Sequence, residues 1–173
     1  MALSNNEIGL LVLYGISVTV TVWTVFIFAF LVYKDPYITA QTKLKNRKRK
    51  NYLVSCMVAV KNEEDNIASC VDSMIAQIYA NKEIIVVNDA STDNTLKVLR
   101  PYVLKRQIIL INLKKNLGKK KALGKAMAIA RGDIFAFTDS DSIWASDVIE
   151  KIETIFEADS DIGAVSGHSR ALN

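Results

Sequence analysis

Two aspartates separated by one residue, Asp139 and Asp141, follow an apolar run at residues 133–138. On an extended backbone, side chains two positions apart point the same way, so both carboxylates can face one ligand. Two hard oxygen donors suit Mg²⁺ or Mn²⁺, which proteins usually hold with one or two carboxylates plus substrate phosphates. The pair therefore predicts a divalent-cation site, although such a tripeptide is often only a solvated lead-in to a helix.

Two further carboxylates, Glu63 and Asp89, come at the ends of earlier apolar runs. Asp89 can accept hydrogen bonds from a nucleobase N–H or a ribose hydroxyl, and Glu63 is a third carboxylate aimed at the same edge. Each has a structural alternative. Glu63 suits the first turn of a helix, and Ser91 or Asp93, close to Asp89, can cap the next helix.

A lysine-rich segment at residues 114–121 places Asn116, Gly118 and Lys119 at the start of a predicted helix. Backbone N–H donors, the helix dipole and an ammonium group together favour phosphate there. The segment lacks the terminal Gly-Lys-Ser/Thr of a P-loop, and no Gly-x-Gly-x-x-Gly follows the first apolar run, so a dinucleotide-binding fold is disfavoured. The structural alternative is a solvated lysine run.

The carboxylates and the lysine-rich segment need a folded framework to bring them together. The sequence provides one, because patterns typical of strands alternate with patterns typical of helices. Short apolar runs predict strands at residues 52–60, 83–87, 107–113, 133–138 and 162–165. Apolar residues at helical spacing predict helices over residues 67–78, 96–103 and 146–156, and an alanine-rich helix that ends at Arg131-Gly132. Asn62 and Ser146 are predicted helix caps, and Pro101 is predicted to interrupt or end the second helix.

Strands that alternate with helices of this length build a parallel sheet covered by helices on both faces, which predicts the α/β fold class. Continuous apolar strands agree, because such strands are buried on both sides. In an open α/β sheet, ligands bind at the carboxyl ends of the strands. Glu63, Asp89 and Asp139 each fall at such an end, so the sequence predicts a single site there.

The composition removes several classes of protein. Two prolines and seven glycines among 173 residues argue against a disordered or collagen-like chain. Two cysteines are too few for a disulfide scaffold or a four-cysteine zinc site, so Cys56 and Cys70 are predicted to be reduced and packed. The single histidine, His168, leaves nothing for a histidine-rich metal centre.

Residues 8–33 carry no charge over 26 positions and predict a transmembrane helix, because a helix of that length exceeds the ~30 Å hydrocarbon core. Residues 43–50 hold six basic side chains and no acidic one, more than the whole net charge of +4. Basic residues beside a membrane helix stay in the cytosol, so the N-terminus is predicted outside. The run could instead bind anionic lipid or nucleic acid, but its place after the helix favours a topology signal, and no nucleic-acid partner is predicted.

The predicted organisation is a single-pass membrane protein in three parts. Residues 1–33 contain the membrane helix, residues 34–51 form a basic juxtamembrane linker, and residues 52–173 form the cytosolic α/β domain.

Four motifs at the predicted strand ends and helix start carry a resemblance to a known family. They are residues 58–64 (Val-Ala-Val-Lys-Asn-Glu-Glu), 88–93 (Asn-Asp-Ala-Ser-Thr-Asp), 116–123 (Asn-Leu-Gly-Lys-Lys-Lys-Ala-Leu) and 137–141 (Phe-Thr-Asp-Ser-Asp). In this order they resemble the nucleotide-binding half of the family 2 inverting glycosyltransferases, which have a Rossmann-like A-type fold and a D-x-D element. With the membrane helix ahead, the chain resembles processive synthases of hyaluronan, poly-N-acetylglucosamine or cellulose-like polymers.

The resemblance implies a role for individual residues. Asp89 would bind the base, typically uracil, and Glu63 would help hold the nucleoside. Asp139 would contact the ribose or pyrophosphate region and the metal, and Asp141 would ligate the Mg²⁺ or Mn²⁺ that bridges the diphosphate. Lys119 would be a further nucleotide contact.

Three more implications follow from the same resemblance. Residues 163–173 resemble the segment after the D-x-D region, which would place His168 and Arg170 near the donor sugar. Ala59 and Lys61 replace the family's usual proline and tyrosine, which is expected to loosen the base pocket. Ala90 replaces its usual glycine, which is expected to alter the turn after Asp89.

The implied activity is metal-dependent transfer of a sugar from a UDP-linked donor to a growing polysaccharide at the cytosolic membrane face. Residues 142–173 hold no recognisable general base, so the chain is predicted to supply only the donor-binding half, as the N-terminal portion of a synthase. Two alternatives stay open. They are a glycosyltransferase acting on a lipid phosphate, and a non-catalytic, membrane-tethered subunit that binds a nucleotide sugar.

Overall fold

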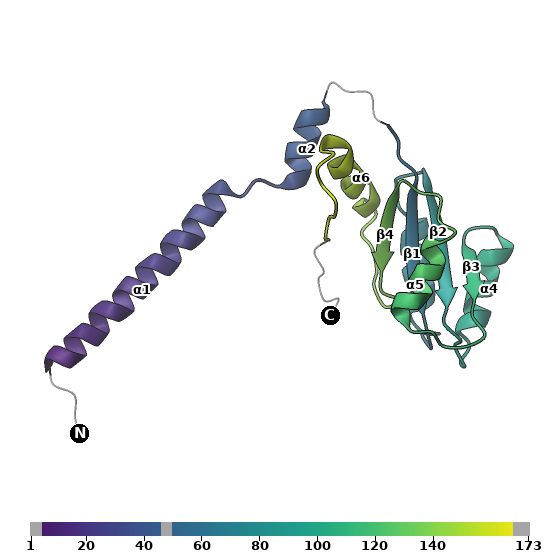
Figure 1. Cartoon of the computed structure of the whole chain (residues 1–173), viewed down its shortest axis with the longest axis horizontal. Helices are drawn as coiled ribbons and strands as arrows, with labels where there is room; N and C mark the ends of the chain where they lie inside the picture. The colour runs from purple at the N-terminus through teal and green to yellow at the C-terminus, as the bar shows by residue number, and fades with distance from the viewer. Residues whose placement is uncertain (1–4, 46–49, 168–173) are drawn as a thin grey trace. The chain divides into compact units, whose positions relative to one another are not determined.

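The structure, a computed structural model, describes residues 5–45 and 50–167 (Figure 1). Its internal contacts divide the chain into two compact units, residues 1–39 and residues 40–173. The first unit is mostly one helix, and the second contains the sheet.

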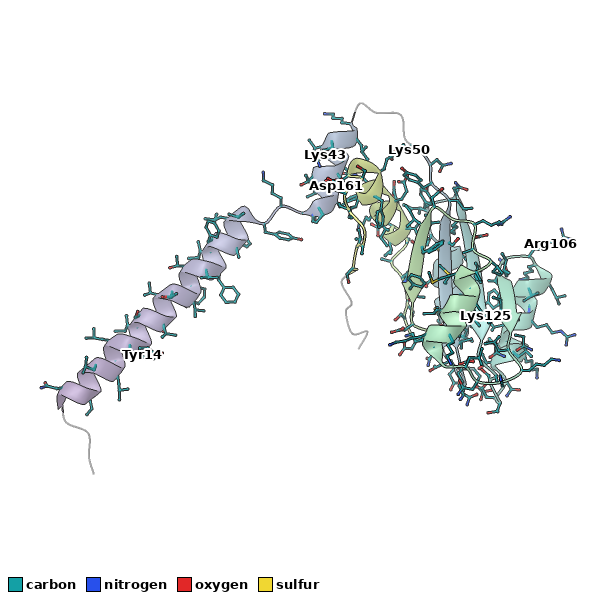
Figure 2. All side chains as sticks on the ribbon, viewed as in Figure 1. Tyr14, Lys43, Lys50, Arg106, Lys125 and Asp161 are labelled. Atoms are coloured by element: carbon teal, nitrogen blue, oxygen red, sulfur yellow. The ribbon has the colours of Figure 1, made fainter. Side chains whose placement is uncertain are left out.

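Helix α1 (Asn5–Val32) is 28 residues long. Its described side chains are exposed all round the helix, as Figure 2 shows for Tyr14 and its neighbours. Thr19, Thr21 and Thr24 donate their hydroxyl protons to backbone carbonyls one turn earlier, at 2.7 to 2.9 Å, so these polar groups are satisfied within the helix. By length and composition α1 can cross a membrane, as predicted for residues 8–33.

Helix α2 (Pro36–Leu44) lies within residues 34–51, which were predicted only as a linker. Asp35 caps this helix, because its Oδ1 atom accepts the N–H of Tyr37 at 2.8 Å and that of Ile38 at 3.4 Å. An aspartate followed by proline at the first helical position is a helix-start signal. The residues predicted as a linker therefore contain a helix, and Asp35 followed by Pro36 is the sequence signal for its start.

The second unit is built on a four-stranded parallel sheet in the order β3-β2-β1-β4. The strands span Val54–Val60 (β1), Lys82–Asn88 (β2), Ile109–Asn112 (β3) and Ile134–Thr138 (β4). All seven residues of β1 are buried, as expected of a central parallel strand covered on both faces. The predicted parallel α/β sheet is confirmed for its first four strands.

Four helices cover this sheet: α3 (Ile67–Ile75), α4 (Thr95–Leu104), α5 (Lys119–Met127) and α6 (Val148–Ala158). On one face, α5 packs Ala122 and Ala126 against Met57 and Ile85, which are register partners in β1 and β2 (Figure 1). The other face carries the larger cluster, to which α3, α4 and α6 contribute. Cys56 and Cys70 are free and buried within it, as predicted.

Two predicted elements differ from the structure. Residues 162–165 form no strand and pair with none in the described part of the chain. That run is short and contains Gly163, which disfavours a strand because glycine loses the most backbone freedom when ordered. Helix α4 passes through Pro101 and ends at Leu104. Proline removes one backbone hydrogen bond and crowds the carbonyl one turn earlier, so the helix ends one turn later, while the buried Leu99 anchors it to the sheet.

Neither predicted cap stands at the start of a helix. Asn62 has a left-handed backbone with a φ of 54°, and the residue at the N-cap of α3 is Asn66. Helix α6 begins at Val148 with Asp147 at its N-cap, so Ser146 lies one residue too early. The Asn62 side chain instead accepts the N–H of Thr92 in a neighbouring loop, and a local pattern cannot reveal such a partner.

Candidate functional site

The predicted site residues gather at the carboxyl ends of the strands. Glu63 follows β1, Asp89 follows β2 and Asp139 follows β4, while Lys119 is the first residue of α5. Strand β1 pairs with both β2 and β4, so the three strand ends are adjacent. The structure thus brings these four residues to one edge of the sheet.

An ion pair joins two of these residues directly. The Nζ atom of Lys119 pairs with Oδ1 of Asp139, and both side chains are more than half exposed. Asp141 is also exposed, two residues further along the loop. Burial raises the pKa of the Cys70 thiol, and the charges of Asp141 and Asp139 raise it further, to about 11. The two aspartates therefore form a solvent-facing acidic pair beside α3, with a lysine in contact.

Asp89 is buried and already accepts hydrogen bonds from the backbone. Its Oδ1 accepts the N–H of Leu117 at 2.7 Å, and its Oδ2 accepts the N–H of Gly118 at 2.8 Å. Gly118 has a φ of 82°, which favours glycine, and it immediately precedes α5. Asp89 therefore fixes the turn that presents Lys119, and each of its oxygens can still accept one more hydrogen bond.

The loops after β1 and β2 are tied together by residues that were not predicted as part of the site. The Asn62 Oδ1 accepts the N–H of Thr92 at 2.8 Å, the N–H of Glu63 donates to Thr95 Oγ1 at 3.0 Å, and the Glu64 carboxylate accepts the N–H of Asn94 at 2.7 Å. These bonds hold Glu63 against the neighbouring loop. The Asn-Glu-Glu motif is visible in the sequence, but its partners lie about thirty residues away.

A second polar cluster lies at the opposite ends of the strands. Glu83 Oε1 accepts the Ser55 hydroxyl and the Arg131 N–H, each at 2.7 Å, and Oε2 accepts the Arg131 guanidinium at 2.9 and 3.0 Å. The N–H of Gly132 donates to the Ser55 hydroxyl at 2.9 Å. Ser55 and Glu83 are buried, and the cluster joins β1 and β2 to the segment just before β4, so it supports the sheet rather than the candidate site.

His168 and Arg170 lie outside the described residues. Their assignment to the donor sugar stays a prediction.

Residues 55–171 match the family described as Glycosyl transferase family 2. The chain belongs to this family. The resemblance carried by the four motifs is thereby confirmed, and so is the fold that it implied, since the solved structures below share it.

Two relatives illustrate how much of the domain is shared. The poly-beta-1,6-N-acetyl-D-glucosamine synthase of Staphylococcus aureus (strain MSSA476) is 32% identical over 120 residues, which cover 69% of this chain and 29% of that protein. An uncharacterized glycosyltransferase of Haemophilus influenzae is 39% identical over 117 residues, covering 67% of this chain and 36% of that protein. The chain thus spans about a third of the length of these relatives.

Two solved structures have a similar fold. The mannosyltransferase PcManGT of Pyrobaculum calidifontis, in complex with GDP-Man and Mn²⁺, gives a TM-score of 0.65 at 28% identity over 89% of this chain and 47% of that one. TarS of S. aureus in complex with UDP gives a TM-score of 0.56 at 27% identity over 60% of this chain and 32% of that one.

The acidic pair fits a divalent cation that a ligand helps to coordinate. Among the described residues, no group of three or more His, Cys, Asp or Glu side chains is placed to hold a metal. Asp139 and Asp141 offer two hard oxygen donors, and Mg²⁺ or Mn²⁺ usually completes such a pair with phosphate oxygens and water. The donor set therefore suits a cation that shares its ligands with a diphosphate.

Proposed function

We propose that this chain binds a UDP-linked sugar together with Mg²⁺ or Mn²⁺, as the donor-binding half of a glycosyltransferase that extends a polysaccharide. The observation that carries the proposal is the acidic pair Asp139 and Asp141 at the carboxyl end of β4, with Lys119 in contact, in a family 2 domain. Similarity to the poly-N-acetylglucosamine synthase supports a polysaccharide product, and similarity to the UDP complex of TarS supports a UDP-linked donor.

Different residues at the sheet edge bind different parts of the donor. Asp139 and Asp141 hold the cation, which when bound stabilises the negative charge that develops on the departing nucleoside diphosphate. The Lys119 ammonium and the first N–H groups of α5 attract the diphosphate. Glu63 and Asp89 hold the nucleoside, with Asp89 keeping the turn before α5 in place.

The remaining assignments concern the sugar, the acceptor and the membrane. His168 and Arg170 contact the donor sugar, and the acceptor is the growing carbohydrate chain. Helix α1 anchors the domain with the N-terminus outside, because the six basic residues at 43–50 keep the following domain at the cytosolic face. Removal of the acceptor proton needs a general base, which is not assigned to any residue of this chain.

A GDP-linked donor is the second candidate. The mannosyltransferase solved with GDP-Man and Mn²⁺ aligns with 89% of this chain, and such a donor would suit transfer to a lipid phosphate. A non-catalytic subunit would bind either donor without transferring its sugar. Sugar transfer by the full chain would exclude that last alternative.

Calorimetric titration of the full chain in detergent with UDP and with GDP, each with and without Mn²⁺, tests the proposal. We expect Mn²⁺ to tighten UDP binding about tenfold or more, because the cation neutralises charge shared by the diphosphate and the acidic pair. Asp141→Asn should remove that gain, whereas Asp161→Asn, an exposed aspartate outside the site (Figure 2), should keep it. Tighter binding of GDP would favour the second candidate, and no metal-dependent binding of either nucleotide would overturn the proposal.

A further inference from the structure

The loop at residues 139–147 joins β4 to α6 and carries Asp139 and Asp141. This loop packs along helix α3, which contains none of the predicted site residues. Three side chains make the contacts. Cys70 and Ser73 lie in α3, and Gln77 lies just beyond its end. Their spacing of three and four residues places them along one side of the helix.

Three hydrogen bonds join α3 to the loop, and their order along the helix matches their order along the loop. The Cys70 thiol donates to the Asp139 carbonyl at 3.5 Å, the Ser73 hydroxyl oxygen accepts the N–H of Trp144 at 3.1 Å, and the Gln77 amide donates to the Ala145 carbonyl at 2.7 Å. The loop between β4 and α6 is therefore fixed to α3 from its first residue nearly to its last.

Gln77 makes the most extensive of these contacts. It is 4% exposed, and its Nε2 donates to the carbonyls of Ser73 at 3.0 Å and Ala145 at 2.7 Å. Its Oε1 accepts the N–H of Ile149, in the first turn of α6, at 3.1 Å. A single buried amide thus joins the end of the loop, the start of α6 and the last turn of α3. A satisfied buried network of this kind specifies one arrangement of its partners.

Hydrogen bonds within the loop also hold its first residues, next to β4. The Trp144 indole Nε1 donates to the hydroxyl of Thr138, the last residue of β4, at 2.9 Å. The N–H of Ser142 donates to the Asp139 carbonyl at 3.2 Å. Asp141 is therefore an exposed residue of a short loop whose two ends are both held by hydrogen bonds.

We propose that Gln77 is a positioning residue for the cation site, because it fixes the loop so that Asp139 and Asp141 can share one cation. The inference rests on the proposed function of that pair. Mg²⁺ requires near-octahedral geometry, so its affinity depends on carboxylates held in place. Residues that orient metal ligands without touching the metal commonly affect affinity 10- to 100-fold.

The test is Mn²⁺ titration of the full chain at saturating UDP. Gln77→Leu keeps the volume but removes both hydrogen-bonding groups, and it should weaken Mn²⁺ about tenfold while UDP binding without metal is unchanged. Tyr102→Phe is the matched control, because it removes a 2.9 Å hydrogen bond that α3 makes through Asp72 on the side facing α4. An equal loss in both variants would overturn the inference, since Gln77 would then act only through the stability of α3.

A double variant distinguishes positioning from general destabilisation. If Gln77 acts through Asp141, Gln77→Leu should have little further effect on Mn²⁺ affinity in an Asp141→Asn background. A full additional tenfold loss there would contradict the inference. If Gln77→Leu does not fold, Ser73→Ala removes the acceptor for the Trp144 N–H together with a 2.7 Å hydrogen bond to the Cys70 carbonyl within α3, and it should give a smaller loss in the same direction.

A measurement without ligand separates this inference from the proposed function. Trp144 is the only tryptophan besides Trp23 of α1, so in a Trp23→Phe background its fluorescence reports on the loop. Acrylamide quenching should increase in Gln77→Leu and stay unchanged in Tyr102→Phe. If the parent protein shows no Mn²⁺-dependent UDP binding, the proposed function fails. If it does, but Gln77→Leu changes neither quenching nor Mn²⁺ affinity, the role of Gln77 fails alone.

Discussion

The ammonium group of Lys119 pairs with the carboxylate of Asp139, and this contact links the first residue of α5 to the residue that follows β4. In the free protein, the lysine thus supplies positive charge to a carboxylate that is proposed to bind a cation. A diphosphate gives Lys119 a new anionic partner and releases Asp139. Metal and diphosphate should therefore promote each other's binding.

Lys119→Met tests this exchange of partners. Without the competing ammonium, Mn²⁺ alone should bind about two- to fivefold more tightly, since exposed ion pairs contribute about 0.2–1 kcal/mol. UDP affinity in the presence of Mn²⁺ should fall, because the diphosphate loses a cationic contact. Electron paramagnetic resonance of free Mn²⁺ and calorimetry with UDP measure the two effects. Lys120→Met, at the next position of α5, is the control, and weaker Mn²⁺ binding in Lys119→Met would contradict the exchange.

Gly132 lies where a side chain cannot fit. A Cβ there would meet the Ser55 Oγ at 2.5 Å, the Ser55 nitrogen at 2.6 Å and the Leu53 carbonyl oxygen at 2.9 Å. Two of these are backbone atoms, of Ser55 within the central strand β1 and of Leu53 just before it, so Gly132→Ala should lower the free energy of unfolding by about 1–3 kcal/mol.

Gly124→Ala is the matched control for Gly132→Ala. A Cβ on Gly124, within α5, meets nothing within 4 Å, so that variant should be stabilised by up to about 1 kcal/mol. Urea denaturation of the two variants checks both signs, and equal shifts would refute the packing argument.

The parallel sheet and the location of the site could be predicted because buried parallel strands appear in the sequence as apolar runs that end in polar clusters. The contacts that fix the loops could not be predicted. Asn62 bonds to Thr92 thirty residues away, and Gln77 bonds to Ala145 sixty-eight residues away, so neither leaves a periodic signal. The run at residues 162–165 shows that an apolar run alone does not make a strand. A strand also needs a neighbouring strand to pair with, and this run pairs with none of the four described strands.

Ala90 adopts a φ of 57° in the turn after Asp89, where the family usually has glycine. The left-handed backbone region costs a residue with a Cβ about 1–2 kcal/mol, and glycine avoids this cost. Glycine also loses more backbone entropy on folding, so Ala90→Gly should stabilise the protein by about 0.5–1 kcal/mol in total. Ala68→Gly, at a half-buried position of α3, should instead destabilise it by about 0.5–1 kcal/mol. Thermal unfolding of both variants tests the opposite signs, and loss of stability in Ala90→Gly would show that the turn favours alanine.

The carboxyl group of Glu83 links the stability of the sheet to pH. Burial acts to raise the pKa of Glu83, but hydrogen bonds from Arg131 and Ser55 and the charge of Arg131 outweigh it, so the pKa is lowered. In the unfolded chain the pKa of a glutamate is about 4.3. The unfolded state therefore binds more protons between the two pKa values. The stability from Glu83 is complete above about pH 4.3 and is lost as the pH falls through the lower folded value.

Glu83→Gln removes this titration. The variant should be less stable at neutral pH, because the charge-assisted bonds to Arg131 are lost, yet its free energy of unfolding should fall less steeply from about pH 6 to about pH 3. Urea denaturation at a series of pH values measures both slopes. Parallel slopes in the two proteins would mean that Glu83 has the same pKa in the folded and unfolded states, and that the cluster around it contributes no acid sensitivity.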